Sequence, residues 1–118
     1  MEFSDNKPIY RQIADHACDM IIGGKWTPGM RVPSVRELAV ELGVNTRTVL
    51  KAMEELQDSG IIFPRRGLGY ILTEDAPSKV RESMRLEFFG ATLPRLASEM
   101  RLLGISPDEI RDALMSLS

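Results

Sequence analysis

Residues 45–51 gather hydrogen-bond donors and cations within two turns of a predicted helix start. They are Asn45, Thr46, Arg47, Thr48 and Lys51. Short polar side chains at the amino end of a helix can cap it, or can bond phosphate oxygens alongside the free backbone N–H groups. An arginine here is long enough to reach a guanine edge through two hydrogen bonds. The pattern indicates contact with a nucleic acid; the alternative is an ordinary capped helix with a solvated polar face.

A second basic group, Arg65 and Arg66, stands directly before Gly67-Leu68-Gly69. Gly67 and Gly69 permit positive φ and close backbone approach, while arginines favour the negative potential of a narrow minor groove. The alternative is a plain hairpin turn with solvated arginines. Apolar runs at residues 61–63 and 70–72 flank the segment. They predict two paired strands with a basic, glycine-rich tip.

Two short amphipathic helices are expected to position the polar and cationic residues of segment 45–51. The earlier one begins at Ser34, where Ser-x-x-Glu with Glu37 forms a capping box, and it stops at Gly43. The later one is capped by Asn45 and ends before Gly60. Both carry apolar residues at i, i+3, i+4 and i+7, so one face of each is expected to be buried. These stripes are Val35, Leu38, Ala39 and Leu42, then Val49, Ala52, Met53 and Leu56.

Arg36 lies on the outward face of the earlier helix, just inside its cap. There it can grip a phosphate backbone or reach a base from the side, and an exposed ion pair with a neighbouring glutamate is the alternative. Ser34 acts mainly as the cap. A first helix is expected from Pro8, as its first helical residue, to Gly23-Gly24. A very short strand is predicted at residues 31–32. A boundary between domains 1–75 and 76–118 is predicted at residues 74–78, which include Pro77.

The region beyond residue 78 has a helical apolar pattern close to a heptad seam, made of Phe89, Leu93, Leu96, Met100 and Leu103. These residues and the neighbouring Phe88 are the candidates for dimerisation. Pro94 lies inside the run and either kinks one helix or begins a second helix after Gly90. Ser106 caps a final helix expected over residues 107–117. So many apolar residues predict a two-fold homodimer; packing back on the amino-terminal domain is the alternative.

Composition limits the remaining functions. The chain has 118 residues, 43% hydrophobic, a net charge of −2 and one cysteine, Cys18. It contains no apolar run of membrane-spanning length, so no membrane partner is expected. We expect a cytoplasmic location. His16 is the only histidine and has no cluster of further ligands around it in the sequence, so no metal site is expected. The sequence also has no phosphate loop or catalytic pairing that would indicate an enzyme or a cofactor. The net negative charge of the chain does not exclude DNA binding, because Arg47 lies at the amino end of its helix and the acidic residues lie at the other end.

Several spaced motifs together resemble the DNA-binding domain of the GntR family of bacterial transcription regulators. They are Pro8-Ile9-Tyr10, Pro28-Gly29, Val32-Pro33-Ser34-Val35-Arg36-Glu37-Leu38-Ala39, Gly43-Val44-Asn45 and Gly67-Leu68-Gly69. The short tail, with Leu103-Gly104-Ile105-Ser106, is similar to the YtrA subfamily. The resemblance implies a homodimeric repressor that binds double-stranded DNA. Its contacts would come from Arg36, the segment 45–48 and the wing, which is the predicted hairpin of residues 61–72.

The sequence departs from the family pattern at two positions. Thr46 stands where many members carry an arginine, and Leu50 replaces a commonly polar residue, so the operator sequence of a relative cannot be transferred. The expected fold is mainly α with a small β-hairpin wing, a winged helix-turn-helix followed by a helical dimerisation segment. The expected function is a sequence-specific DNA-binding regulator on an inverted repeat, with the effector unknown. The alternative is a winged-helix module that binds protein and not DNA.

Overall fold

The computed structural model of the chain describes residues 2–4 and 6–118. They form two compact units, Met1–Arg81 and Glu82–Ser118. Ala76 and Val80 are buried in the core of the first unit, so this unit extends past the boundary that the sequence predicts at residue 75. The assignment of DNA binding to residues 1–75 and of dimerisation to residues 76–118 stays a prediction.

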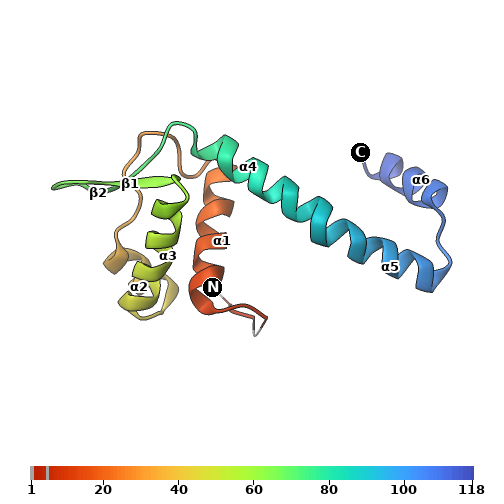
Figure 1. Cartoon of the computed structure of the whole chain (residues 1–118), viewed down its shortest axis with the longest axis horizontal. Helices are drawn as coiled ribbons and strands as arrows, with labels where there is room; N and C mark the ends of the chain where they lie inside the picture. The colour runs from red at the N-terminus through yellow and green to blue at the C-terminus, as the bar shows by residue number, and fades with distance from the viewer. Residues whose placement is uncertain (1, 5) are drawn as a thin grey trace. The chain divides into compact units, whose positions relative to one another are not determined.

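The first unit is built on three helices, α1 (Ile9–Ile22), α2 (Val35–Leu42) and α3 (Thr46–Asp58). Helix α3 packs against both α1 and α2 (Figure 1). The stripe of α3 predicted from the sequence is buried at all four positions, from Val49 to Leu56. Trp26 is buried as well and anchors the loop after α1 on this core. Cys18 is half-buried against the same core, and burial raises the pKa of its thiol to about 11.

Local signals in the sequence set the helix ends. Ser34 and Glu37 form the predicted capping box at α2, and Gly43 ends that helix in the left-handed conformation with φ of 69°. The turn to α3 is therefore Gly43-Val44-Asn45. Pro8 differs from the prediction, because with φ of −54° and ψ of 147° it precedes α1 as its cap residue and Ile9 is the first helical residue.

The hairpin consists of β1 (Ile62–Arg65) and β2 (Gly69–Leu72), paired antiparallel with Ile62 opposite Leu72 and Arg65 opposite Gly69. Both predicted strands are present, but the first begins at Ile62 and not at Ile61, and both reach further toward the tip, since Arg65 and Gly69 belong to the ladder. Only Arg66, Gly67 and Leu68 form the turn. The very short strand predicted at residues 31–32 is a single bridge from Arg31 to Ile71.

The second unit is helical, and its first helix starts in the first unit. This helix, α4 (Ala76–Glu87), begins inside the segment predicted as a boundary, with Pro77 in its first turn, where a missing N–H costs nothing. It continues into a π-helical turn, η1 (Phe88–Thr92), and then α5 (Leu93–Leu103). Within η1 the N–H of Leu93 donates to the carbonyl of Phe88. This wider turn precedes Pro94, and the backbone stays helical from α4 through η1 into α5, with no non-helical break after Gly90.

Helix α6 (Pro107–Leu117) completes the chain with the bounds that the sequence predicts. The chain reverses direction between α5 and α6 (Figure 1), after Gly104 adopts φ of 68°. The predicted fold class is confirmed, because the chain is mainly helical with one two-stranded antiparallel wing. In residues 2–4 and 6–118, no helix combines the length and apolar character needed to cross a bilayer.

Candidate nucleic-acid interface

The amino end of α3 is ordered by Asn45. Its backbone is extended, with φ of −69° and ψ of 142°, and its side-chain oxygen accepts a hydrogen bond of 2.8 Å from the N–H of Arg47. Because this oxygen serves the cap, any contact of Asn45 with a phosphate would use the amide N–H₂ group. Thr46 and Arg47 are exposed, while Thr48 is half-buried. The first turn therefore offers one long cation and short polar groups to solvent.

Burial of the opposite face fixes which residues of α3 point outward. Val49, Ala52 and Met53 are completely buried, so the helix cannot rotate without exposing its core stripe. Leu50 is 41% exposed, on the outward side one turn after Thr46. An apolar side chain in that position offers contact surface without a hydrogen bond. It would suit the methyl group of a thymine in a major groove.

Lys51 is exposed, but its side chain contacts a neighbouring residue. Its ammonium lies 4.1 Å from the centre of the Tyr10 ring, and Arg11 pairs with Glu55 one turn further along. Both contacts join the beginning of α1 to the middle of α3. Lys51 thus stands at the edge of the helix that faces α1, whereas Arg47 stands in the first turn. Tyr10 is a residue that sequence reasoning did not connect with this site.

The amino end of α2 carries Ser34 and Arg36, as predicted. Ser34 is half-buried and its hydroxyl accepts from the N–H of Glu37 at 3.1 Å, while Arg36 is exposed. Hydrogen bonds from Ser34, together with the neighbouring guanidinium of Arg31, hold the pKa of the Glu37 carboxyl below its ordinary value. The cap therefore contains a carboxylate with charge-stabilising partners on two sides.

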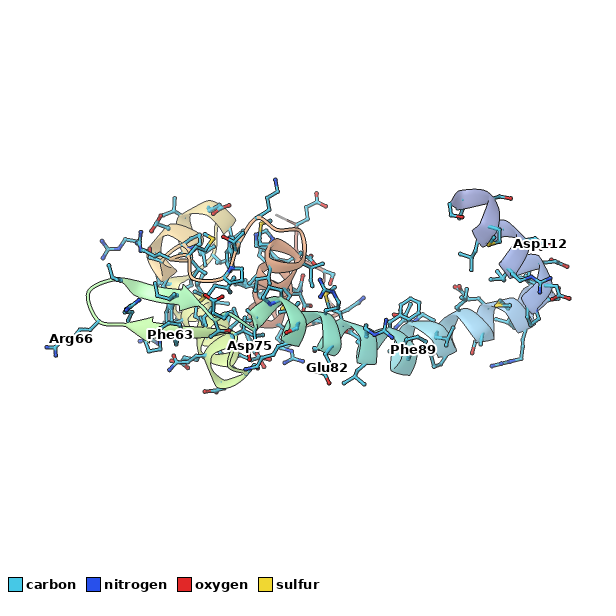
Figure 2. The ribbon with its side chains drawn as sticks, turned by 90° about the horizontal axis from the view of Figure 1, so that it is seen from above. Phe63, Arg66, Asp75, Glu82, Phe89 and Asp112 are labelled. Atoms are coloured by element: carbon cyan, nitrogen blue, oxygen red, sulfur yellow. The ribbon has the colours of Figure 1, made fainter. Side chains whose placement is uncertain are left out.

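The wing is a narrow two-stranded arm with arginine at its end. Gly67 and Gly69 adopt φ of 79° and 83°, and the N–H of Leu68 donates to the carbonyl of Arg65 at 2.9 Å. Arg66 extends from the tip of the arm (Figure 2). Arg65, Arg66, Gly67 and Gly69 are all exposed. The arm presents a cation on a backbone slim enough to approach a groove closely.

Arg31 is the second residue that sequence reasoning missed. Its Nε lies 3.0 Å from the carbonyl oxygen of Leu68, and its Nη2 lies 3.1 Å from Oε1 of Glu37. The sequence offered a weak signal, since Arg31 falls in the predicted short strand beside the wing. Its link to the cap of α2 depends on tertiary packing, which no local pattern reports.

The residues predicted for dimerisation lie in the second unit, and all but Met100 are exposed. Phe88, Phe89, Leu93 and Leu96 are 48%, 55%, 40% and 36% exposed, and Leu103 is 73% exposed. Met100 is half-buried. The two phenylalanine rings meet edge to face, with centroids 5.3 Å apart. Neither α5 nor α6 contains a buried residue, so the other described residues of the second unit do not cover this apolar surface.

Three helices, a helix-turn-helix pair and an adjoining wing with an arginine tip define a winged helix-turn-helix, a class of DNA-binding domain. Residues 9–71 match the bacterial regulatory proteins of the gntR family. The chain belongs to the GntR family of transcription regulators, and its recognised fold and relatives are those of regulators and not of enzymes.

Individual relatives agree with this assignment. The chain is 32% identical over 111 residues to the HTH-type transcriptional repressor YtrA of Bacillus subtilis, covering 94% of this chain and 85% of that one. A GntR family transcriptional regulator from Listeria monocytogenes superposes with a TM-score of 0.77 at 35% identity, covering 98% of this chain and 100% of that one.

A third relative was solved with its ligand. AraR(DBD) in complex with operator ORR3 superposes with a TM-score of 0.56 at 26% identity, covering 62% of this chain and 88% of that chain.

Proposed function

We propose that the protein is a dimeric repressor that binds an inverted-repeat operator, with α3 in the major groove and the wing in the minor groove. It would act in the cytoplasm on duplex DNA. The observation that carries the proposal is the exposed cationic first turn of α3, held by a cap and backed by a fully buried stripe. The YtrA repressor and the operator complex of AraR support the same assignment by similarity.

Each predicted residue has a role in this proposal. Arg47 reads a base edge from the major groove, and Asn45, Thr46 and Thr48 bond phosphates near the helix end. Ser34 holds the start of α2, from which Arg36 reaches the phosphate backbone, while Lys51 adds a phosphate contact further along α3. Arg65 and Arg66 supply charge to the wing, and Gly67 and Gly69 let its backbone approach the minor groove.

Dimerisation is proposed from the uncovered apolar seam of the second unit. A two-fold axis would give two copies of α3 the same relation to two half-sites, separated by about one helical turn of DNA or a multiple of it. Selection of bound sequences from random duplexes, by the full-length protein, tests this. The proposal expects a motif with dyad symmetry, and recovery of no motif, or of a single asymmetric half-site, would contradict it.

A second function is favoured by one observation, the acidity of the carboxyl end of α3. Glu54 and Asp58 are exposed and Glu55 is half-buried, and a duplex would repel them. They would suit a basic protein partner if the domain served as an interaction module. The salt dependence of DNA affinity distinguishes the two functions. The affinity of a protein that contacts phosphates falls steeply between 50 and 200 mM salt, by about 10³-fold or more for six contacts.

A further inference from the structure

The segment before α2 forms a backbone connection with the wing. The N–H of Val32 donates to the carbonyl of Tyr70 at 3.0 Å, and the N–H of Leu72 donates to the carbonyl of Met30 at 2.9 Å. Arg31 lies between these bonds, opposite Ile71. Val32 is 1% exposed, so its burial fixes the backbone at this point. The Arg31 side chain therefore starts from a rigid position at the base of the hairpin.

The guanidinium of Arg31 joins two elements with two different nitrogen atoms. Nε donates to the carbonyl of Leu68, in the turn of the wing, at 3.0 Å. Nη2 donates to Oε1 of Glu37, in the first turn of α2, at 3.1 Å. A guanidinium presents its donors in a planar fork of fixed geometry, which a lysine ammonium cannot reproduce. One side chain thus fixes the distance between the wing turn and the start of α2.

Glu37 is a firm anchor for this link. The same Oε1 accepts from the N–H of Ser34 at 3.3 Å, and the N–H of Glu37 donates to the Ser34 hydroxyl at 3.1 Å. The carboxylate is thereby part of the helix cap and not a side chain free to sample several rotamers. The wing turn is connected, through Arg31 and Glu37, to α2, the helix that precedes α3.

We propose that Arg31 is a positioning residue that locks the wing against the amino end of α2 and so sets where Arg66 meets DNA. The proposal rests on the DNA-binding function above. A two-stranded hairpin alone is marginally stable in water, and the turn of this wing lies beyond the bridge to Arg31. Locking the arm before binding avoids the loss of conformational freedom on association, which otherwise weakens affinity.

A double-mutant cycle tests the proposal in the full-length protein. Binding of Arg31→Ala, Arg66→Ala and the double variant is measured by fluorescence anisotropy on a duplex that the unmodified protein selects. Loss of the lock should weaken binding about three- to tenfold, the size expected for ordering one or two side chains. Because the lock acts through Arg66, Arg31→Ala should cost little further affinity in the Arg66→Ala background.

A direct phosphate contact by Arg31 predicts something different. The two substitutions would then be additive, and Arg31→Ala alone would reduce the slope of log affinity against log salt by about 0.9. Lys25→Ala, which removes one positive charge from an exposed loop after α1, controls for net charge. Arg31→Lys keeps the charge but loses the fork, so the lock predicts at most partial rescue, whereas a phosphate contact predicts nearly full rescue.

Glu37→Gln gives the sharpest contrast. Glutamine can still accept from Ser34 and cap α2, but it no longer offers a carboxylate to Arg31. Removing an anion near DNA would by itself raise affinity, so a drop in affinity that disappears in the Arg66→Ala background supports the lock. An increase in affinity would overturn it.

Hydrogen exchange in the free protein supplies a readout that does not require DNA. The N–H of Leu68, which is bonded to Arg65, should exchange faster in Arg31→Ala and Glu37→Gln while the core of α3 exchanges at its original rate. Unchanged exchange at Leu68 would overturn the lock even if DNA binding holds. Failure of the unmodified protein to bind any duplex, with faster exchange in the variants, would instead contradict the proposed function and leave the lock supported.

Discussion

The ammonium group of Lys51 lies 4.1 Å from the centre of the Tyr10 ring, which ties α3, the proposed recognition helix, to α1. A cation over an aromatic face is attracted by the negative face of the ring quadrupole. The ion pair between Arg11 and Glu55 lies on the same side of α3. Together they hold the middle of α3 against α1, in addition to the packing of its buried stripe on the core.

The Lys51–Tyr10 contact should appear as an energetic coupling. In a double-mutant cycle with Tyr10→Leu and Lys51→Met, followed by urea unfolding, we expect a coupling free energy of about 0.5–1 kcal/mol. Both substitutions retain an apolar body, so the cycle reports the charge–ring attraction and not lost packing. Additivity of the two substitutions within about 0.3 kcal/mol would show that the contact contributes nothing to stability.

The cap at Asn45 can be separated from its proposed phosphate contact. Asn45→Ala should lower the free energy of unfolding by about 1 kcal/mol, because the N–H of Arg47 loses its acceptor. Asn45→Asp retains an acceptor and should keep near-normal stability, but it places an anion beside the proposed phosphate. DNA affinity of Asn45→Asp should therefore fall by about tenfold or more. Thermal unfolding and anisotropy measure the two effects, and equal DNA affinity in Asn45→Asp and the unmodified protein would contradict the contact.

Stability should depend on pH through Glu37. Its pKa in the folded protein is below the ordinary value of 4.5, through hydrogen bonds from Ser34 and the charge of Arg31. The unfolded chain therefore binds a proton first as the pH falls, so the contribution is fully present above the ordinary pKa and is lost as the pH falls through the lower folded pKa.

The unfolding free energies of the unmodified protein and Glu37→Gln, measured from pH 7 to pH 3, check this dependence. Because glutamine does not titrate, the difference between the two proteins should shrink toward acid pH. A difference that stays constant over this range would show that the carboxylate charge has no stabilising role in the cap.

The apolar seam of the second unit should control assembly. Leu96→Arg places a charge within the predicted seam and should convert a dimer into a monomer with the 13.2 kDa mass of one chain. Leu102 is more exposed, at 85% against 36% for Leu96, and lies outside the predicted seam, so Leu102→Arg is a matched control. Sedimentation equilibrium distinguishes them. Dimers of equal strength for both variants would contradict the assignment of the seam.

Local features of the sequence predicted much of the fold. Ser34, Glu37, Gly43 and Asn45 mark helix ends by their own hydrogen bonds and backbone angles, which depend on residues close in the chain. The buried stripe of α3 follows from helical periodicity alone. For the same reason the final helix, whose cap is Ser106, was predicted with its correct bounds.

Features that depend on tertiary or competing backbone effects were missed. The sequence left Pro94 between two interpretations, because a π-helical turn that accommodates it is not indicated by any residue type. Pro77 marked a boundary in the sequence, yet it opens α4 because Ala76 and Val80 pack on the core of the first unit. The roles of Tyr10 and Arg31 require contacts between segments distant in sequence, which periodicity does not contain.

In the proposed complex the first turn of α3 and the tip of the wing act on one duplex from different grooves. Dimethyl sulfate probing tests it directly, since the reagent methylates guanine N7 in the major groove and adenine N3 in the minor groove. On the selected operator, Arg47→Ala should lose guanine protection and keep adenine protection, while Arg66→Ala should do the reverse. Protection of both bases that neither substitution alters would contradict the account.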